Sequence, residues 1–497
     1  MHSHSALKSP PAIAESLTAP SQARSQRRFR NVSEPVVGGL TAAWDGVCVL
    51  VAGLVAVLCT SPEAGVDWRL TGLIVAVGAT LAINLLNVAG AYRLETLRQV
   101  EKSFGQVLCG WLLTVGTLVA ILHVTSTSSS ATTAWLLTWS VAGLTLLSTN
   151  RLVLYHLTTK WSRAGKLTRR VAVVGAGPIG QRLLVHLSNQ TGASRLEIVG
   201  IYDDRSERLP RRCFGYPLLG DVDNLVRDVR EDLIDMVIVA LPLSADWRLS
   251  EVMKKLITVP VDVRICPDLF GFQIGACSVT HLGAVSLLNV VDRPLRDWHW
   301  IIKAAEDRIL AVLILFMISP VMALIALLIK LDSPGPVFFK QKRYGFNNEL
   351  IDVFKFRTMY HHAQDANAEQ LTKRNDPRVT RLGSFLRRTS LDELPQFINV
   401  LRGEMSIVGP RPHALAAKAG QILYQEAVQC YDARHRVKPG ITGWAQVNGW
   451  RGETETVEQI QKRVEHDLYY IEHWSVALDL KIIVRTILGG FTGRQAY

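Results

Sequence analysis

Four apolar stretches follow one another in the first third of the chain, and each is about as long as a helix that crosses a bilayer. They cover residues 40–60, 69–91, 105–124 and 132–150. Buried helices of a soluble protein can be equally apolar, but four in succession favour membrane spans. The pattern predicts a unit of four transmembrane helices over 39–155, preceded by a disordered basic tail over 1–38 that is too polar to form a core.

Positive charge alternates along the connections between these stretches. Lys and Arg gather in the tail, in 92–104 and after residue 150, whereas 61–68 and 124–131 contain neither. Because positively charged connections remain in the cytoplasm, both ends of the unit are predicted to lie there. The formal net charge of +12 is assigned to contact with a membrane surface. The chain contains no nucleic-acid-binding motif, so nucleic acid is not an expected partner.

A strand, a turn and a helix are predicted from residue 169, where the chain reads RRVAVVGAGPIGQRLLVHL. Gly175, Gly177 and Gly180 have the Gly-x-Gly-x-x-Gly spacing of dinucleotide-binding domains. Apolar strands ending near residues 203, 242 and 268 extend the pattern and predict a Rossmann-like α/β domain with a parallel sheet over 165–292. The glycines could bind a nucleotide or only let the helix pack on the strand. An oxidoreductase or dehydratase is disfavoured, because no tyrosine has a lysine four positions later.

A fifth apolar run, 309–329, has Ser319 and Pro320 at its midpoint and basic residues on both sides. Proline removes a backbone hydrogen bond and kinks a helix, and flanking positive charge opposes moving either end across a membrane. We expect a re-entrant helix over 305–330 that breaks at Ser319 and Pro320 and returns to the face from which it entered. The alternative, a straight fifth span, would place everything after it on the other side.

The segment SLDELPQFINVLRGEMSIVGPRP, 390–412, places the adjacent acids Asp392 and Glu393 among arginines at 387, 388, 402 and 411. Guanidinium groups match phosphate oxygens with paired donors, and a carboxylate among them stays ionised, so it can act as a nucleophile or bind Mg²⁺. Helix capping is the simpler alternative, because Ser390-x-x-Glu393 is also a capping-box pattern. Capping would leave the arginines unexplained, so the segment predicts phosphate chemistry.

Three long motifs resemble the bacterial sugar transferase family, the polyprenyl-phosphate hexose-1-phosphate transferases or monotopic phosphoglycosyl transferases. They read DSPGPVFFKQKRYGFNNELIDVFKFRTM from residue 332, NDPRVTRLGSFLRRTSLDELPQFINVLRGEMSIVGPRP from 375 and KPGITGWAQVNGWRGET from 438. The resemblance covers 300–497 and implies an α/β phosphoglycosyl transferase domain with a re-entrant helix. The four spans and the Rossmann-like region are similar to those of the long-form members.

The resemblance implies a role for each residue that matches a motif. Asp392 corresponds to the nucleophile, which would form a covalent aspartyl phospho-sugar, and Glu393 to the acid that holds Mg²⁺, the one implied cofactor. Arg387, Arg388 and Arg411 are the first expected cationic partners of the phosphate groups. Further substrate-binding residues are expected at Lys340, Arg343, Lys355, Arg357, Arg378, Pro410 and Pro412.

The implied reaction transfers glucose-1-phosphate from UDP-glucose to undecaprenyl phosphate and releases UMP, as the first step of an exopolysaccharide repeat unit. The choice of glucose rests on the likeness of GWAQVNGWRGET and of Ala496-Tyr497 to the glucose enzymes. Galactose or an N-acetylhexosamine is one alternative, and a membrane scaffold that recruits downstream glycosyltransferases is another. The expected location is the bacterial inner membrane, with this domain on the cytoplasmic face. The oligomeric state stays open, and a homodimer is one option.

Overall fold

The computed structural model describes two compact units, a helical one within 27–168 and an α/β one from residue 169 onward. The described residues are 33–60, 68–125, 130–163, 167–189, 196–205, 208–242, 244–266, 279–282, 285–363, 376–413, 418–419, 422–424, 428, 430–450 and 456–489. Most of the predicted basic tail, 1–32, and the C-terminal Ala496-Tyr497 lie outside them. The last residues of that predicted tail, 34–38, are instead the first turn of a helix.

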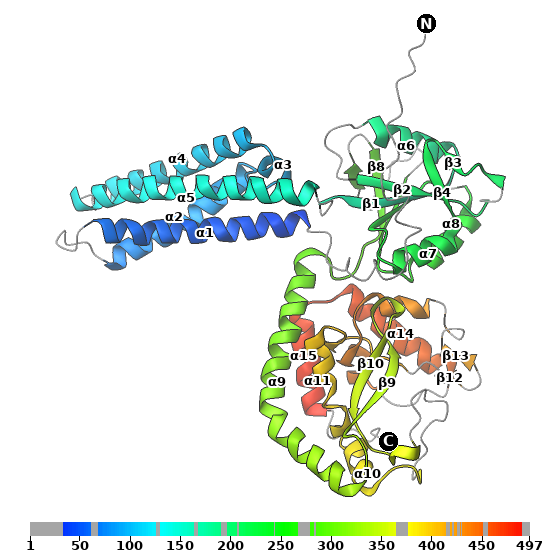
Figure 1. Cartoon of the computed structure of the whole chain (residues 1–497). Helices are drawn as coiled ribbons and strands as arrows, with labels where there is room; N and C mark the ends of the chain where they lie inside the picture. The colour runs from blue at the N-terminus through cyan, green and yellow to red at the C-terminus, as the bar shows by residue number, and fades with distance from the viewer. Residues whose placement is uncertain are drawn as a thin grey trace. The chain divides into compact units, whose positions relative to one another are not determined.

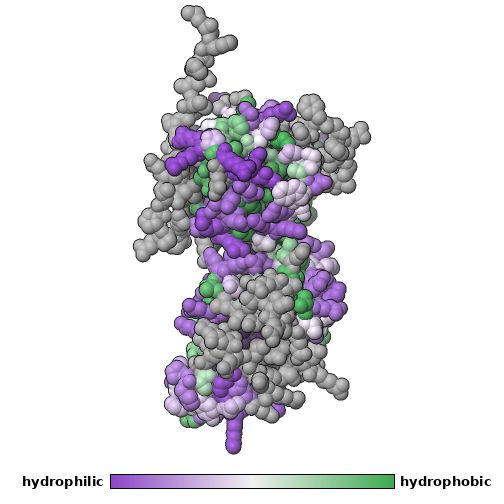
Figure 2. Space-filling model, turned by 90° about the vertical axis from the view of Figure 1, so that its right-hand side faces the viewer, coloured by the Kyte–Doolittle hydropathy of each residue, from purple (hydrophilic) through white to green (hydrophobic). Residues whose placement is uncertain are grey.

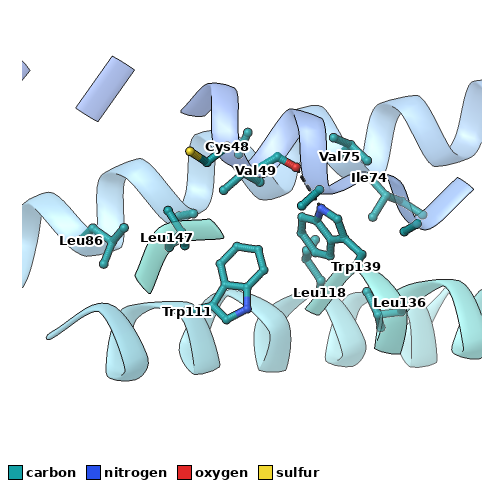
Figure 3. Packing of buried hydrophobic residues seen from close by; sticks show 14 of the residues in the cluster. Cys48, Val49, Ile74, Val75, Leu86, Trp111, Leu118, Leu136, Trp139 and Leu147 are labelled. Carbon is teal, nitrogen blue, oxygen red and sulfur yellow. Dashed lines mark hydrogen bonds between the residues drawn. The ribbon is translucent and has the colours of Figure 1, made fainter. Parts of the chain in front are cut away.

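Four long helices form the helical unit. They are α1 (Glu34–Cys59), α2 (Trp68–Val88), α4 (Val100–Val124) and α5 (Ser130–Arg163), with a short α3 (Leu94–Leu97) between α2 and α4. Figure 3 shows their common core, where the indole N–H of Trp139 donates to the carbonyl of Val49 at 3.1 Å. Trp111 packs against Gly143, where an added Cβ would come within 2.3 Å of the indole ring. Large rings therefore fit because glycines face them.

Among the described residues, four helices are long and apolar enough to cross a membrane: α1, α2, α4 and the later helix α9. The fourth predicted span lies in α5, which is not one of them. Threonines and serines interrupt its apolar stretch, for example Thr138, Ser140 and Thr145. Each of these hydroxyls donates to the backbone carbonyl four residues earlier, at 2.6–3.0 Å, which lowers the cost of placing it in an apolar environment.

An eight-stranded sheet of order β3-β4-β2-β1-β5-β6-β8-β7 forms the first half of the α/β unit. Its parallel centre is β4 (Tyr216–Gly220), β2 (Leu196–Tyr202), β1 (Arg169–Val174), β5 (Met236–Val239) and β6 (Asp262–Ile265). The outer strands pair antiparallel, so the sheet is mixed rather than wholly parallel as predicted. They are β3 (Arg212–Cys213) at one edge, and β8 (Val285–Val291) followed by β7 (Val279–Leu282) at the other.

Side chains that alternate along β1 explain why helices cover both faces of this sheet. Val171 and Val173 pack with α6 (Pro178–Asn189). Ala172 and Val174 point to the other face and pack with α7 (Val222–Arg230) and α8 (Asp246–Leu256). The arrangement is Rossmann-like, and Figure 1 shows α6 across the sheet from α7 and α8.

The C-terminal domain, 297–489, is built around a hairpin and a group of short helices. The hairpin pairs β9 (Phe338–Tyr344) with β10 (Leu350–Phe356). The helices are α10 (Arg381–Arg388), the 3₁₀ turn η8 (Leu391–Glu393), α11 (Gln396–Arg402), η9 (Tyr431–Arg436), α13 (Trp444–Val447), α14 (Val457–Glu472) and α15 (Val476–Gly489). The parallel pair β11 (Ser406–Val408) and β14 (Gly440–Thr442) lies within the core. Smaller elements are η6 (Phe346–Asn348), η7 (His361–Ala363), β12 (Lys418–Ala419) and β13 (Ile422–Leu423).

Helix α9 (Asp297–Asp332) runs along one side of this domain and curves around its lower end in Figure 1. It continues through Pro320 as one helix of 36 residues, so the predicted break is not an interruption of the helix. Proline leaves the Phe316 carbonyl without its usual donor, and the Ser319 hydroxyl donates to that carbonyl at 2.9 Å. Ala311 on the first half and Ile329 on the second are both buried in this one domain.

The outer face of α9 is strongly apolar and exposed. Exposed large apolar side chains occur on both halves of the helix, including Leu313 (60%), Phe316 (83%), Met317 (72%), Leu324 (56%) and Leu331 (75%). Figure 2 views the α/β unit from the side away from α9, and the described residues there are mostly hydrophilic. The outer face of α9 therefore gives the domain an exposed apolar surface.

Candidate active site

The acidic pair lies in the 3₁₀ turn η8, between α10 and α11. Ser390 begins the turn with a left-handed φ of 56° and makes no side-chain cap, so the capping-box alternative is wrong. A non-glycine residue in this conformation costs about 1–2 kcal/mol. With about three residues per 3₁₀ turn, adjacent side chains point about 120° apart, so Asp392 and Glu393 face different surroundings.

Two cations from distant parts of the chain hold Glu393. Lys355 on β10 places its Nζ 2.9 Å from Glu393 Oε1. Arg411, which follows β11, donates from two nitrogens to the two carboxylate oxygens, at 2.6 and 3.1 Å. Burial alone would raise the pKa of Glu393, but Arg411 and Lys355 outweigh it and hold the pKa well below its ordinary value. Glu393 is therefore ionised and fixed in place.

Asp392 is in the opposite situation. Its side chain is 9% exposed, and within the described residues no hydrogen bond or ion pair ends on its carboxylate. Burial raises the pKa of Asp392 to about 6, although the positive charges of Lys355, Arg387 and Arg411 oppose the shift. A buried carboxylate with unshared oxygens is a group that can react with, or bind, something that enters the site.

Glycines with no space for a side chain fix the backbone that carries Arg411. Gly409 follows β11, and an added Cβ would lie 2.6 Å from the Lys438 carbonyl. At Gly440 on β14 an added Cβ would lie 2.1 Å from the Gly409 amide nitrogen. The Gly440 amide donates to the Pro410 carbonyl at 3.0 Å. The GPRP and KPGITG motifs therefore pack backbone against backbone, and both are needed to place Arg411.

Two further predicted arginines lie beside the pair. Arg387, in the last turn of α10, donates from Nε to the Thr358 hydroxyl at 2.8 Å and its charge acts on Asp392. Arg343 on β9 donates to the Pro412 carbonyl at 3.1 Å. Burial and the nearby Arg411 lower the pKa of Arg343 to about 10, which indicates a cation that is poorly compensated. The structure thus brings together Lys355, Arg387, Arg343, Arg411 and the two acids.

The remaining predicted binding residues have other contacts. Arg357 is buried and donates to the carbonyls of Ile329, Ser333 and Pro334, so its guanidinium caps the C-terminus of α9. Arg378 is paired with Asp376 in a local turn at 2.6 Å. Lys340 lies over the Phe354 ring, 5.4 Å from its centroid. Arg388 is exposed on α10, and no described contact links it to the acidic pair.

The Gly-rich turn of the Rossmann-like domain is largely explained by packing. Gly175 has φ +107°, and a Cβ there would approach the Ala240 carbonyl to 2.8 Å. At Gly180 a Cβ would lie 2.2 Å from the Gly175 carbonyl, whereas Gly177 has open space. Asp203, where a ribose would be expected, already accepts from the Ala176 amide and pairs with Arg205 and Arg248. The nucleotide-binding role of the three glycines stays a prediction.

The acidic pair leaves room for one divalent cation. The described residues contain no group of three or more His, Cys, Asp or Glu side chains that could hold a metal. Mg²⁺ does not need one, because it is commonly bound by one or two carboxylates together with substrate phosphates and water. Within the described part of the chain three hydrogen bonds end on Glu393, which leaves one of its about four acceptor positions, and none ends on Asp392. The residues therefore fit the predicted ion.

Sequence reasoning missed a second buried layer behind Arg411, made of Arg434, His413, Asp467 and Arg463. These residues come from η9, from the end of the GPRPH segment and from α14. The Arg463-x-x-x-Asp467 spacing on one helix face was the available signal, but it is also typical of an ordinary surface ion pair.

A buried carboxylate with no described partner, beside an acid held by two cations and in a domain with an exposed apolar helix, fits a membrane-associated transferase of phosphate-linked groups. The chain belongs to the bacterial sugar transferase family. Residues 298–493 match the family model described as bacterial sugar transferase, and 87–267 match one described as a CoA-binding domain.

Relatives that match most of this chain support the assignment. The chain is 37% identical to a protein of Escherichia coli (strain K12) named UDP-glucose:undecaprenyl-phosphate glucose-1-phosphate transferase, over 95% of this chain and 99% of that one. It is 42% identical to the undecaprenyl-phosphate glucose phosphotransferase of Komagataeibacter xylinus, over 72% of this chain and 66% of that one. Among solved structures, a Rex-family repressor covers 25% of this chain and 56% of its own at a TM-score of 0.19 and 18% identity, which supports no conclusion.

Proposed function

We propose that this chain transfers glucose-1-phosphate from UDP-glucose to undecaprenyl phosphate, giving undecaprenyl-diphosphate-glucose and UMP. The observation that carries the proposal is the contrast between the two acids: Asp392 has unshared oxygens, and Glu393 is held by Lys355 and Arg411. The names of the Escherichia coli and Komagataeibacter xylinus relatives support glucose as the sugar. A relative of Rhizobium leguminosarum bv. phaseoli named exopolysaccharide production protein PSS, which matches 40% of this chain, supports exopolysaccharide assembly as the purpose.

The chemistry takes two displacements at one phosphorus. In the first, an Asp392 oxygen attacks the phosphorus next to glucose, the bond from that phosphorus to the bridging oxygen breaks, and UMP leaves with the electron pair. In the second, an oxygen of the lipid phosphate attacks the same phosphorus and the Asp392 carboxylate leaves. Neither step consumes a proton or an oxidant. Arg411, Arg387 and Arg343, which lie around the acidic pair, would compensate the charge on the phosphoryl oxygens.

Glu393, with Asp392, would hold the Mg²⁺ ion. When bound, the ion would supply positive charge against the diphosphate and the departing UMP. The chain's own part is to keep Glu393 ionised between Arg411 and Lys355, whatever occupies its remaining acceptor position.

Access for the lipid substrate is proposed from the side formed by α9. A polyprenyl chain stays in the bilayer, so its phosphate must be met at the membrane surface. Each half of the apolar run on α9 is about 16 Å long at about 1.5 Å per residue, which is roughly half of a 30 Å hydrocarbon core. Because both halves are buried against one domain, we propose that α9 enters and returns to the cytoplasmic face of the inner membrane.

Cysteine labelling tests this topology. Single cysteines at Arg308 and Lys330, on the two sides of the apolar run, should both react with an impermeant maleimide from the cytoplasmic side of inverted vesicles. Reaction of Lys330→Cys from the opposite side only would overturn the re-entrant arrangement.

Release of UMP tests the reaction. Membranes containing the protein, given Mg²⁺, undecaprenyl phosphate and UDP-glucose, should release UMP and form a glucose-bearing lipid. Incubation without the lipid should leave phosphoglucose on Asp392, detectable by mass spectrometry of the peptide and absent from Asp392→Asn. Faster turnover of UDP-N-acetylgalactosamine, the substrate in the name of an Aeromonas hydrophila relative that is 35% identical, would replace glucose in the proposal. If no UDP-sugar gave UMP, the transferase proposal would be wrong, and a membrane scaffold would be the remaining alternative.

A further inference from the structure

Arg434, in η9, contacts the residues on both sides of Pro412. Its NH2 donates to the Arg411 carbonyl at 2.7 Å, and its NH1 lies 2.6 Å from Nδ1 of His413. The side chain of Arg434 is fully buried. The Arg434 guanidinium thus contacts both the backbone of Arg411, which binds Glu393, and the ring of His413.

The guanidinium of Arg434 is itself held by one residue of α14 and by one residue of its own turn, η9. Asp467 on α14 forms an ion pair with it at 2.7 Å, and that carboxylate is only 2% exposed. The Tyr431 hydroxyl accepts from Arg434 NH1 at 3.0 Å. Taking such an ion pair out of water costs several kcal/mol per ion, and apolar side chains of the same volume commonly stabilise a fold as well or better. Stability of the core alone is therefore a weak explanation for this pair.

A second guanidinium extends the same contact. Arg463, one turn before Asp467 on α14, approaches Nε2 of His413 at 3.1 Å and donates to the Trp450 carbonyl at 2.6 Å. Arg343 holds the Pro412 carbonyl. Each of the three consecutive residues 411–413 is thus contacted by a guanidinium from another part of the domain.

We propose that Arg434, oriented by Asp467, is a positioning residue that holds Arg411 in the geometry required for phosphoryl transfer. Arg434 makes no described contact with the acidic pair. It contacts the Arg411 carbonyl, and the Arg411 side chain makes the bonds to Glu393. The proposal rests on the proposed role of Arg411 and adds that this role depends on α14. Misplacement of a catalytic group by about 1 Å can reduce a rate by about 100-fold, which is the scale of the expected effect.

A double-mutant cycle on the full-length protein in membranes separates this role from a structural one. Arg434→Lys keeps the charge that compensates Asp467 but offers a single ammonium in place of the fork, so kcat/KM for UDP-glucose should fall about 10- to 100-fold. In an Arg411→Lys background the same substitution should cost less than about 3-fold, because Arg434 acts through Arg411. Asp467→Asn, which is isosteric, should show the same loss and the same dependence on Arg411.

Arg436→Lys is the matched control. Arg436 lies on the same 3₁₀ turn and is also buried, but it donates to the Asp292 carbonyl. Its kcat/KM should stay within about 3-fold of the wild type, and the melting temperatures of all variants in detergent establish that they are folded. Equal losses from Arg434→Lys in both backgrounds would overturn the positioning role and leave only a structural one. Full activity of Arg411→Lys and Arg411→Ala would instead refute the proposed role of Arg411 itself.

Discussion

Arg411 binds both oxygens of Glu393, at 2.6 and 3.1 Å, while the adjacent Asp392 has no such partner. The two neighbouring carboxylates therefore differ in their partners and in the direction of their pKa shifts. Glu393 is ionised and binds Lys355 and Arg411, whereas Asp392 is buried, with a raised pKa and unshared oxygens. Pairs of acids whose pKa values are pushed apart are typical of sites where each acid has its own task.

Glu393→Gln should reduce both activity and stability. The amide is neutral, so Lys355 and Arg411 would lose their common counter-charge in a buried site, a change that typically costs about 3–5 kcal/mol. We expect a loss of about 100-fold in kcat/KM for UDP-glucose and a lower melting temperature. UMP release and thermal unfolding of the purified protein measure the two effects.

Glu404→Gln provides the matched control, because Glu404 is a half-buried acid of the same domain that accepts one hydrogen bond from Asn399. Its activity should remain within about 3-fold of the wild type. A Glu393→Gln protein with normal turnover would remove Glu393 from the mechanism.

Asp392→Asn should abolish turnover and yet stabilise the fold. Burial raises the pKa of Asp392 to about 6 from an ordinary 3.8, so ionisation favours the unfolded chain. The resulting loss of stability is absent below about pH 4, grows as the pH rises to about 6 and is complete above that. The variant should therefore melt at a higher temperature than the wild type at pH 7.5, with the difference disappearing near pH 4. Equal melting temperatures at pH 7.5 would contradict the raised pKa.

The sequence predicted the six side chains that lie together at the site, because each stands in a motif rich in charge and turn residues. They are Arg343, Lys355, Arg387, Asp392, Glu393 and Arg411. It did not distinguish Arg357 from them. An arginine in such a motif has the same donors whether it binds phosphate oxygens or the last carbonyls of a helix. Arg357 binds the carbonyls at the end of α9, and this depends on how α9 packs, which the motif does not show. The sequence also suggested that Ser390 caps a helix, because of its spacing from Glu393. The left-handed backbone of Ser390 is not visible in that spacing, and its side chain makes no cap.

The layer formed by Arg434 and Asp467 could not be predicted for a different reason. The two residues come from separate elements, and their pairing depends on how α14 packs beside η9. The Rossmann-like sheet was easier to predict, because apolar runs predict buried strands directly. Short edge strands such as β3 have too few residues to show a pattern. Local patterns therefore predicted the elements, and long-range packing determined the partners.

The stability of the protein should fall as the pH drops below about 6.5. Burial lowers the pKa of His413 well below its ordinary value and that of His435 to about 3. The charged or titratable groups that face His413 are Tyr431, Arg434 and His435 on η9, Arg463 on α14 and Arg343 on β9. Below about pH 6.5 these histidines are protonated in the unfolded chain but stay neutral in the folded one. The free energy of unfolding therefore falls by about 1.4 kcal/mol per pH unit for each histidine.

Melting temperatures between pH 7.5 and 5 measure this effect. His413→Gln should give a shallower decline than the wild type, because one of the two groups no longer titrates. His473→Gln, which replaces an exposed histidine at the end of α14, should keep the wild-type slope. A decline that His413→Gln leaves unchanged would show that other groups set the acid sensitivity.

The exposed face of α15 should be part of the surface that meets the lipid substrate. Leu480, Val484, Ile487 and Leu488 recur at helical spacing and are 48–73% exposed, whereas Ile482 on the opposite face is buried in the core. Arg485 lies over the Trp444 ring beside this face, 5.4 Å from its centroid, as expected of a helix in the membrane interface.

Glutamate at both Val484 and Ile487 should therefore raise the KM for undecaprenyl phosphate in proteoliposomes about 10-fold and leave the KM for UDP-glucose within about 2-fold. Two glutamates at the exposed polar positions Gln461 and His473 add the same charge elsewhere and should change neither constant. If the KM for the lipid stayed the same in the α15 variant, the apolar face of that helix would have to be covered by something other than the membrane.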